Sequence, residues 1–123
     1  MNRPLTDHDL KKFAVYLKNF RGLFMRDDLP NKPWLNECGI INLDASAGPG
    51  THWTSYIKKK NQVYFFNSYG DLKPPKEFIK YMKNFKVYYN YTRYQQKHSF
   101  VCGQLSLLYL LDPSFVTTYK NVT

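Results

Sequence analysis

The sequence predicts an α+β domain in which a central, mostly antiparallel sheet packs against a buried helix. Three observations lead to this fold. Residues 105–111 consist mainly of leucine, which is typical of a helix buried in a core. Residues 52–58 and 62–67 have the pattern of two strands and are joined by a short polar connection, which predicts a hairpin. Helical segments stand before, between and after the strands, an order that indicates an α+β architecture.

The length and composition indicate one globular domain over residues 1–123. Hydrophobic residues make up 43% of the chain, and the formal net charge is +9. A chain of this length buries about two-thirds of its unfolded surface, so it needs no disulfide to fold. No apolar run is long enough to span a membrane, and the first 13 residues contain no apolar signal segment. We therefore expect an intracellular protein that is not secreted, with both cysteines as thiols.

In the first half of the chain, Thr6 has the pattern of an N-cap and opens a helix expected over residues 7–19. Residues 20–24 are expected to be short and irregular. Residues 26–33 form a loop with two prolines, and Trp34 is expected to anchor this loop on the core. Residues 39–43 (GIINL) predict a buried strand, and residues 44–50 predict a loop rich in glycine, serine and proline.

In the second half, the hairpin of residues 52–58 and 62–67 is followed by a turn. Two prolines then favour a helix over residues 75–84, and residues 86–91 predict a further strand. A loop over residues 95–102 leads into the leucine-rich helix, which Asp112-Pro113 ends. One or two helical turns are expected in the remaining tail.

Cys102 stands where the polar loop changes into the leucine-rich helix, so it is predicted at or near the helix N-terminus. The unpaired N–H groups and the helix dipole favour an anion there, and thus the thiolate form of a cysteine. The alternative is that Cys102 is a small apolar residue of the core.

Further polar residues can meet Cys102 at one edge of the sheet. His52 opens the first hairpin strand and Asn67 closes the second, so the two residues end side by side. Gln95 or Gln96 precedes Cys102 in the loop. A histidine base, a group that orients it and N–H donors are what a thiol nucleophile needs. A structural histidine beside Trp53 is the alternative.

Three motifs resemble the adenovirus-type (adenain-like) cysteine proteases of adenoviruses and Maverick/Polinton-like virus elements. These motifs are GTHW at residues 50–53, YFFNSYG at 64–70 and YQQKHSFVCG at 94–103. Their order and spacing together are specific, although each is weak alone. The resemblance extends over residues 10–111 and implies a minimal version of the papain/SUMO-protease core, whose buried helix carries the cysteine nucleophile.

The resemblance implies a role for each matching residue. Cys102 matches the nucleophile, His52 the general base and Asn67 the residue that orients the histidine. Gln95 stands seven positions before Cys102, as the oxyanion-hole glutamine does in adenovirus-type members. Gln96, six positions before, fits the SUMO-protease branch and remains an alternate. The main-chain N–H of Cys102 would be the second oxyanion donor, and Trp53 and Gly103 would line the substrate cleft.

One position departs from the family pattern, because many members carry Asp or Glu where this chain has Asn67. An amide can still accept a hydrogen bond from the imidazole, but it supplies no charge to an imidazolium. Asp71, four residues further on, is the alternate acid. Cys38 is interpreted as a core thiol, since no motif supports the peptide-linking role that a second cysteine has in the adenovirus enzyme.

The resulting hypothesis is a cysteine endopeptidase that processes viral or virus-like structural precursors through an acyl-enzyme intermediate. It would need no metal or cofactor for its chemistry. DNA or a peptide could stimulate it, and the net charge of +9 is compatible with stimulation by DNA. We expect a monomer without membrane attachment, in the host nucleus or the virion. Two alternatives remain: a deconjugase for ubiquitin-like modifiers, and a catalytically silent, basic nucleic-acid-binding module.

Overall fold

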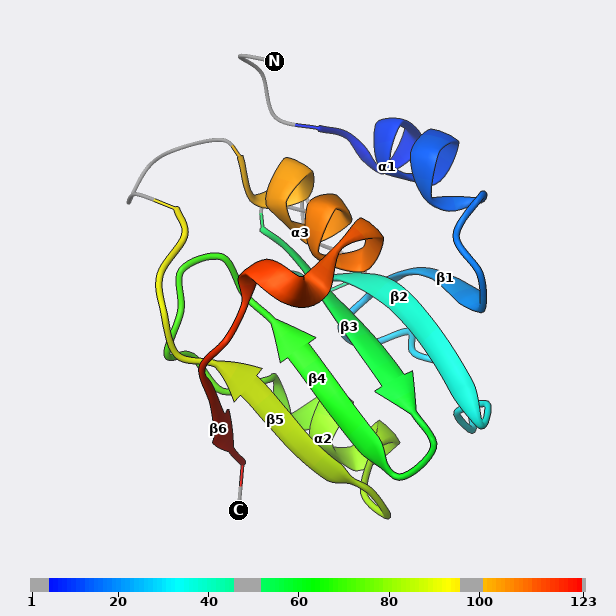
Figure 1. The fold of residues 1–123 in the computed structure, drawn as a ribbon. Coiled ribbons are helices and arrows are strands. Elements are labelled where there is room, and N and C mark those ends of the chain that lie inside the picture. Colours follow the sequence, from blue (N-terminus) through cyan, green and yellow to red (C-terminus); the bar gives the residue numbers. More distant parts are fainter. Residues whose placement is uncertain (1–4, 46–51, 96–100, 123) are drawn as a thin grey trace.

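The computed structural model describes residues 5–45, 52–95 and 101–122, which form one six-stranded sheet with helices on both faces (Figure 1). The strands lie side by side in chain order. The elements are α1 (Asp7–Ala14), β1 (Phe20–Met25), β2 (Asn36–Asn42), β3 (Trp53–Lys59), β4 (Gln62–Phe66), α2 (Lys76–Tyr81), β5 (Lys86–Asn90), α3 (Cys102–Leu111), η1 (Pro113–Phe115) and β6 (Tyr119–Asn121). The predicted α+β class is confirmed.

The sheet is mixed. Antiparallel pairing joins β2 to β3, β3 to β4 and β5 to β6, whereas β1 with β2 and β4 with β5 are parallel. The predicted hairpin is confirmed as β3 and β4, which pair from Ser55 with Phe66 to Lys59 with Gln62. His52 and Asn67 stand one residue beyond the two strands, at the end of the sheet away from the hairpin turn.

Each face of the sheet has its own apolar core. One face packs on α2 and contributes Ile41, Tyr56, Val63, Phe65 and Val87 to a cluster with Phe78, Tyr81 and Met82. The other face packs on α1 and α3, where Ile40 and Trp53 meet Leu10, Cys102 and Leu107. In Figure 1, α1 and α3 lie on the side of the sheet opposite α2. The cysteine helix therefore has the sheet as its support.

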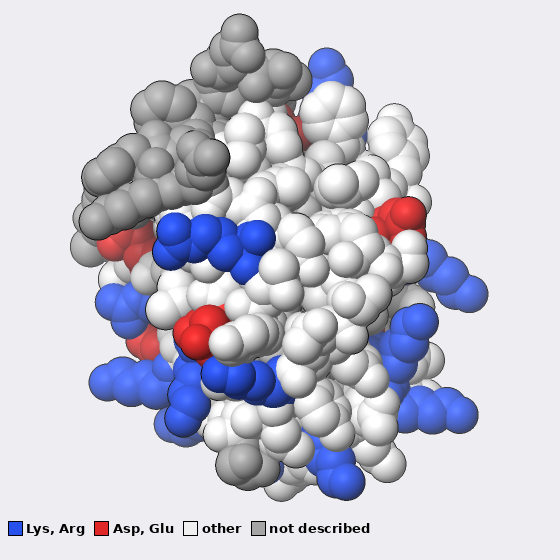
Figure 2. Space-filling model, turned by 60° about the vertical axis from the view of Figure 1, so that its left-hand side comes forward, with Lys and Arg blue, Asp and Glu red and all other residues white. Residues whose placement is uncertain are grey.

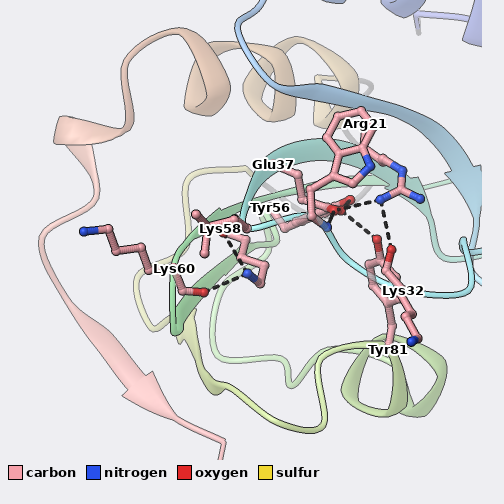
Figure 3. A network of polar contacts seen from close by, with 9 residues as sticks. Arg21, Lys32, Glu37, Tyr56, Lys58, Lys60 and Tyr81 are labelled. Atoms are coloured by element: carbon pink, nitrogen blue, oxygen red, sulfur yellow. Dashed lines mark hydrogen bonds and ion pairs between the residues drawn. The ribbon is translucent and has the colours of Figure 1, made fainter.

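A buried carboxylate joins the elements on the α2 side (Figure 3). Glu37 is 1% exposed; its Oε2 accepts hydrogen bonds from the hydroxyls of Tyr56 at 2.5 Å and Tyr81 at 2.8 Å. Its Oε1 accepts from Arg21 Nη1 at 3.2 Å and from the main-chain N of Trp34 at 2.6 Å. Burial and the charge of Glu37 hold the pKa of Tyr56 well above its usual value. Four donors thus replace the water that the carboxylate has lost.

Several sequence predictions need correction. Residues 20–24 were expected to be irregular, but they lie within β1, an edge strand that pairs in parallel with β2. The first helix ends at Ala14, earlier than expected, and Asn19 has a positive φ of 61° before the chain enters β1. Trp34 does not anchor in the core: it is 47% exposed, with the Arg21 guanidinium 4.4 Å from its ring centroid.

The tail was predicted to be helical, and this holds only for the single turn η1. The chain then forms β6, a short strand that pairs with β5. Over the described ranges 5–45, 52–95 and 101–122, no helix combines the length and apolar character needed to cross a membrane.

Candidate active site

Cys102 is the first residue of α3, as predicted, and it is buried between the helix and the sheet. The helix is tied to β3 by two hydrogen bonds of Ser106. Its Oγ donates to the main-chain oxygen of Trp53 at 3.1 Å, and its main-chain oxygen accepts from Ser55 Oγ at 2.9 Å. Helix side chains lean toward the N-terminus while carbonyls point toward the C-terminus. The N-terminus of α3 therefore lies at the end of the sheet where β3 begins (Figure 1).

The geometry brings Cys102 and His52 to the same end of the sheet. Cys102 lies one helical turn before Ser106, on the same face of α3. His52 lies one residue before Trp53, the residue that Ser106 binds. A Cβ added to Gly103 would stand 3.5 Å from Cδ1 of Trp53, so the tryptophan ring contacts the first turn of the helix.

The imidazole of His52 is held by two residues that follow β4. Its Nε2 lies 2.9 Å from Oδ1 of Asn67, and its ring stacks on Tyr69 with centroids 4.7 Å apart. An amide oxygen only accepts, so Nε2 carries the proton and Nδ1 is the basic nitrogen of the neutral ring. The predicted meeting of His52 and Asn67 at the sheet edge is thus present.

Burial lowers the pKa of His52 from its ordinary value of 6.5, and the hydrogen bond to Asn67 offsets part of this shift. At neutral pH the ring is therefore mainly the neutral base. This is the protonation state that can accept a proton from a thiol.

Asn90, at the end of β5, fixes the main chain of Asn67. Its Oδ1 accepts from the Asn67 N at 2.8 Å, and its Nδ2 donates to the Asn67 oxygen at 2.8 Å. The side chain of Asn67 also accepts from the main-chain N of Tyr69 at 3.0 Å. Sequence reasoning missed Asn90; the available signal was a polar residue directly after the aromatic positions of the last predicted strand.

Gln95 contacts Ser68, the residue that follows Asn67. The main-chain oxygen of Ser68 accepts from the N of Tyr94 at 2.8 Å and from the N of Gln95 at 3.0 Å. The Ser68 hydroxyl donates to Oε1 of Gln95. Ser68 was also missed from the sequence. Gln96, the alternate oxyanion residue, falls outside the described residues.

Asp71, the alternate partner of His52, has a different neighbour. Its carboxylate lies 2.7 Å from Nζ of Lys120 and is half exposed, and its main-chain N donates to the oxygen of Asn90. The partner of His52 in this structure is Asn67. Trp53, predicted to line the substrate cleft, is mostly buried, and its Nε1 donates to the oxygen of Leu5 at 3.2 Å.

Cys38 is at the opposite end of β2 from the His52 edge, since it pairs with Ile57 while Asn42 pairs with Trp53. Burial and the charge of Glu37 raise the pKa of the Cys38 thiol to about 11. It therefore stays protonated at neutral pH, as expected for a core thiol. Across the described parts of the chain, no group of three or more His, Cys, Asp or Glu residues has metal-binding geometry.

The described residues place a cysteine at the start of α3 and a His–Asn pair just beyond β3 and β4, and these are the three residue types of papain-like triads. The chain resembles the solved structure of SUMO protease Ulp1 with the catalytic cysteine oxidised to a sulfinic acid. The TM-score is 0.58 at 14% identity, over 92% of this chain and 67% of that one. It also resembles ASFV pS273R protease, with a TM-score of 0.64 at 18% identity, over 89% of this chain and 58% of that one.

No protein-family model and no curated protein matches the chain in sequence. At 14% and 18% identity, the two likenesses establish the fold, which this chain shares with viral and SUMO-type cysteine proteases. The chain spans 67% of one of these proteins and 58% of the other.

Proposed function

We propose that the protein is a cysteine peptidase with Cys102 as nucleophile, His52 as general base, Asn67 as the group that orients His52 and Gln95 as oxyanion donor. The observation that carries this proposal is the 2.9 Å contact between His52 Nε2 and Asn67 Oδ1, at the end of the sheet where the Cys102 helix begins. That contact leaves Nδ1 of the histidine as the atom for proton transfer. The fold shared with cysteine proteases supports the same role.

The reaction follows from these positions. His52 Nδ1 takes the thiol proton, and the Cys102 sulfur attacks the carbonyl carbon of the scissile bond. The oxyanion of the tetrahedral intermediate is bound by the main-chain N–H of Cys102 and the Nε2 of Gln95. The imidazolium then protonates the leaving amine, which leaves a thioester on Cys102. Water, deprotonated by His52, hydrolyses the thioester and restores the thiol.

We propose a viral or virus-like structural precursor as the substrate, cleaved inside the polypeptide. The three sequence motifs and the likeness to ASFV pS273R protease support this choice. The likeness to SUMO protease Ulp1 supports a second candidate, removal of a ubiquitin-like modifier by the same residues. We also propose that the protein acts in the host nucleus or the virion, in line with the family resemblance, and that it is a monomer.

Stimulation by DNA or a peptide is part of the proposal, supported for DNA by the net charge of +9. On the face shown in Figure 2, Lys and Arg side chains are spread around a broad uncharged area, with acidic side chains among them. Such a distribution supports a general attraction to polyanions rather than a defined binding surface for one nucleic acid. Salt would screen this attraction.

The test compares the wild-type protein with Cys102→Ala and, as a matched control, Cys38→Ala. Each is incubated with a library of internally quenched peptides and with fluorogenic ubiquitin-like modifier conjugates. We expect cleavage by wild type and Cys38→Ala, and none by Cys102→Ala. Peptide cleavage favours the endopeptidase and modifier release the deconjugase. Cleavage that survives in Cys102→Ala would contradict the proposal, and a wild type that cleaves neither would favour the nucleic-acid-binding module.

A further inference from the structure

We infer that Ser68 is a positioning residue that orients the side-chain amide of Gln95, so that one dipeptide, Asn67-Ser68, aligns both the base and the oxyanion donor. The inference rests on the proposed function and adds a residue to it. Asn67 reaches His52 with its side chain, and Ser68 reaches Gln95 with its own. The two halves of the site are therefore held by neighbouring residues at the end of β4.

Ser68 binds Gln95 both at its main-chain N–H and at its side-chain amide. The main-chain oxygen of Ser68 accepts from the Gln95 N at 3.0 Å, and the Ser68 hydroxyl donates to Oε1 of Gln95. Both side chains are buried, with Ser68 at 0% and Gln95 at 3% exposure. In this buried site the oxygen and the NH₂ group of the Gln95 amide have different surroundings.

The direction of the Ser68–Gln95 hydrogen bond decides what the amide can do. An amide presents an acceptor oxygen on one side and an NH₂ donor on the other. Because the Ser68 hydroxyl occupies Oε1, the donor side of the amide faces away from Ser68. The reverse orientation would turn an oxygen toward the developing oxyanion, which repels it. The hydroxyl thus selects the productive orientation.

The main chain that carries Asn67 and Ser68 is held in place by Asn90. Asn90 binds the main chain of Asn67 through two hydrogen bonds of 2.8 Å, and Ser68 follows directly. A glutamine side chain has three rotatable bonds, and an oxyanion donor is effective only when it is fixed before the charge develops. Loss of the Ser68 hydroxyl should therefore impair oxyanion binding while leaving the Cys102–His52 pair unchanged.

The experiment uses two reactions of the same thiol. Hydrolysis of the best peptide or modifier substrate passes through an oxyanion, whereas alkylation of Cys102 by iodoacetamide displaces iodide at a saturated carbon and forms none. In Ser68→Ala we expect kcat to fall by about 10- to 100-fold, up to the loss from deleting one oxyanion donor. We expect an unchanged KM and an unchanged pH profile of Cys102 alkylation.

The matched control is Thr54→Val, which removes another fully buried hydroxyl, bonded to the oxygen of Ile41 at 2.8 Å, without touching Gln95. We expect it to lower stability but to keep kcat within about twofold, because Thr54 shares no hydrogen bond with Gln95 and its loss acts independently of the oxyanion donor. The coupling is tested in a cycle with Gln95→Ala. On that background, Ser68→Ala should lower kcat no further, because the amide it orients is gone.

A wild-type kcat in Ser68→Ala, or an equal loss with and without Gln95, would overturn this inference alone. A wild type that hydrolyses neither substrate class would overturn the proposed function as well. One measurement needs no variant and so remains decisive if Ser68→Ala does not fold. By NMR, the Ser68 hydroxyl proton of the wild type should be protected from solvent exchange and close to the Gln95 side chain; a rapidly exchanging hydroxyl would contradict the inference.

Discussion

Ser106 Oγ donates a hydrogen bond to the main-chain oxygen of Trp53 at 3.1 Å, and this contact joins the helix that begins at Cys102 to the strand that follows His52. Cys102 stands one helical turn before Ser106, and His52 stands one residue before Trp53. The bond is buried, so its loss takes a hydrogen-bond donor away from a buried carbonyl. The alignment of the thiol and the imidazole therefore depends on the packing of α3 against β3.

Replacing Ser106 with Ala should test that dependence. We expect the free energy of unfolding to fall by about 1–3 kcal/mol, since a buried acceptor is left unsatisfied. Turnover should fall as well, because the first turn of α3 loses its registration on β3. Urea unfolding and peptidase assays measure the two effects. Ser114→Ala, which removes an exposed hydroxyl bonded to Asp112, is the control and should change neither. Wild-type stability in Ser106→Ala would contradict this role.

His52 should titrate below 6.5 in the folded protein, because burial disfavours the imidazolium. The Cys102→Ala variant removes the thiol from the titration, and NMR of the His52 ring protons then reports its pKa. Asn67→Ala should lower this pKa further, since the hydrogen bond that raises it is lost. A pKa above 6.5 in Cys102→Ala would mean that burial does not dominate.

The same shift predicts how stability depends on pH. The unfolded chain binds a proton to His52 at a higher pH than the folded chain does, so ΔG of unfolding rises with pH in the interval between the two pKa values. The contribution is complete above 6.5 and is lost as the pH falls through the folded pKa. Urea unfolding at a series of pH values measures it. The slope between these values should be smaller in His52→Ala, and an identical slope would contradict the assignment.

Asn67 and Asp71 are the two candidates for the partner of His52, and their variants should differ sharply. Asn67→Ala should lower kcat by about 10- to 100-fold, because the base loses the group that fixes its orientation and tautomer. Asp71→Ala breaks only an exposed ion pair with Lys120, so kcat should stay within about twofold. Steady-state kinetics of the two variants decide the question. If Asp71→Ala were the crippling change, the role given to Asn67 would be wrong.

Tyr81→Phe separates stability from catalysis. The Tyr81 hydroxyl donates to the buried carboxylate of Glu37 at 2.8 Å, on the α2 side of the sheet. Its removal takes one of four donors from a buried charge and should cost about 1–3 kcal/mol. Turnover per folded molecule should not change, since the network contacts none of the proposed catalytic residues. A fall in kcat measured well below the melting temperature would indicate that the network also supports the site.

The features that the sequence predicts well are encoded locally. The start of α3 at Cys102 follows from a change of polarity and a glycine, and the hairpin of β3 and β4 from two strand patterns with a short connection. The N-cap at Thr6 is likewise local, because its hydroxyl and Asp9 form a reciprocal capping box. The meeting of His52 and Asn67 then follows from hairpin geometry alone.

The missed features depend on partners far away in the chain. The edge strands β1 and β6 form only because β2 and β5 offer hydrogen-bonding partners, so their own residues carry a weak signal. Asn90 and Ser68 act on residues more than 20 positions away, which no local pattern reveals. Trp34 was misplaced because a large apolar ring suggests a core residue, whereas it lies outside and contacts Arg21.

The central claim is that Cys102 is a poised nucleophile, and the most direct test compares it with Cys38 in one molecule. The two thiols are 7% and 8% exposed, so access to a reagent is matched. Cys38, with a pKa of about 11, is ionised in only about one molecule in 10,000 at pH 7. An ordinary thiol would already react about 100-fold faster than Cys38 at pH 7, because the pKa of Cys38 is raised from 9.0 to about 11. Iodoacetamide labelling at pH 7, followed by peptide mass spectrometry, should therefore modify Cys102 well over about 100-fold faster than Cys38, and His52→Ala should slow the labelling of Cys102 without changing that of Cys38. Equal, slow labelling of both cysteines would contradict the account.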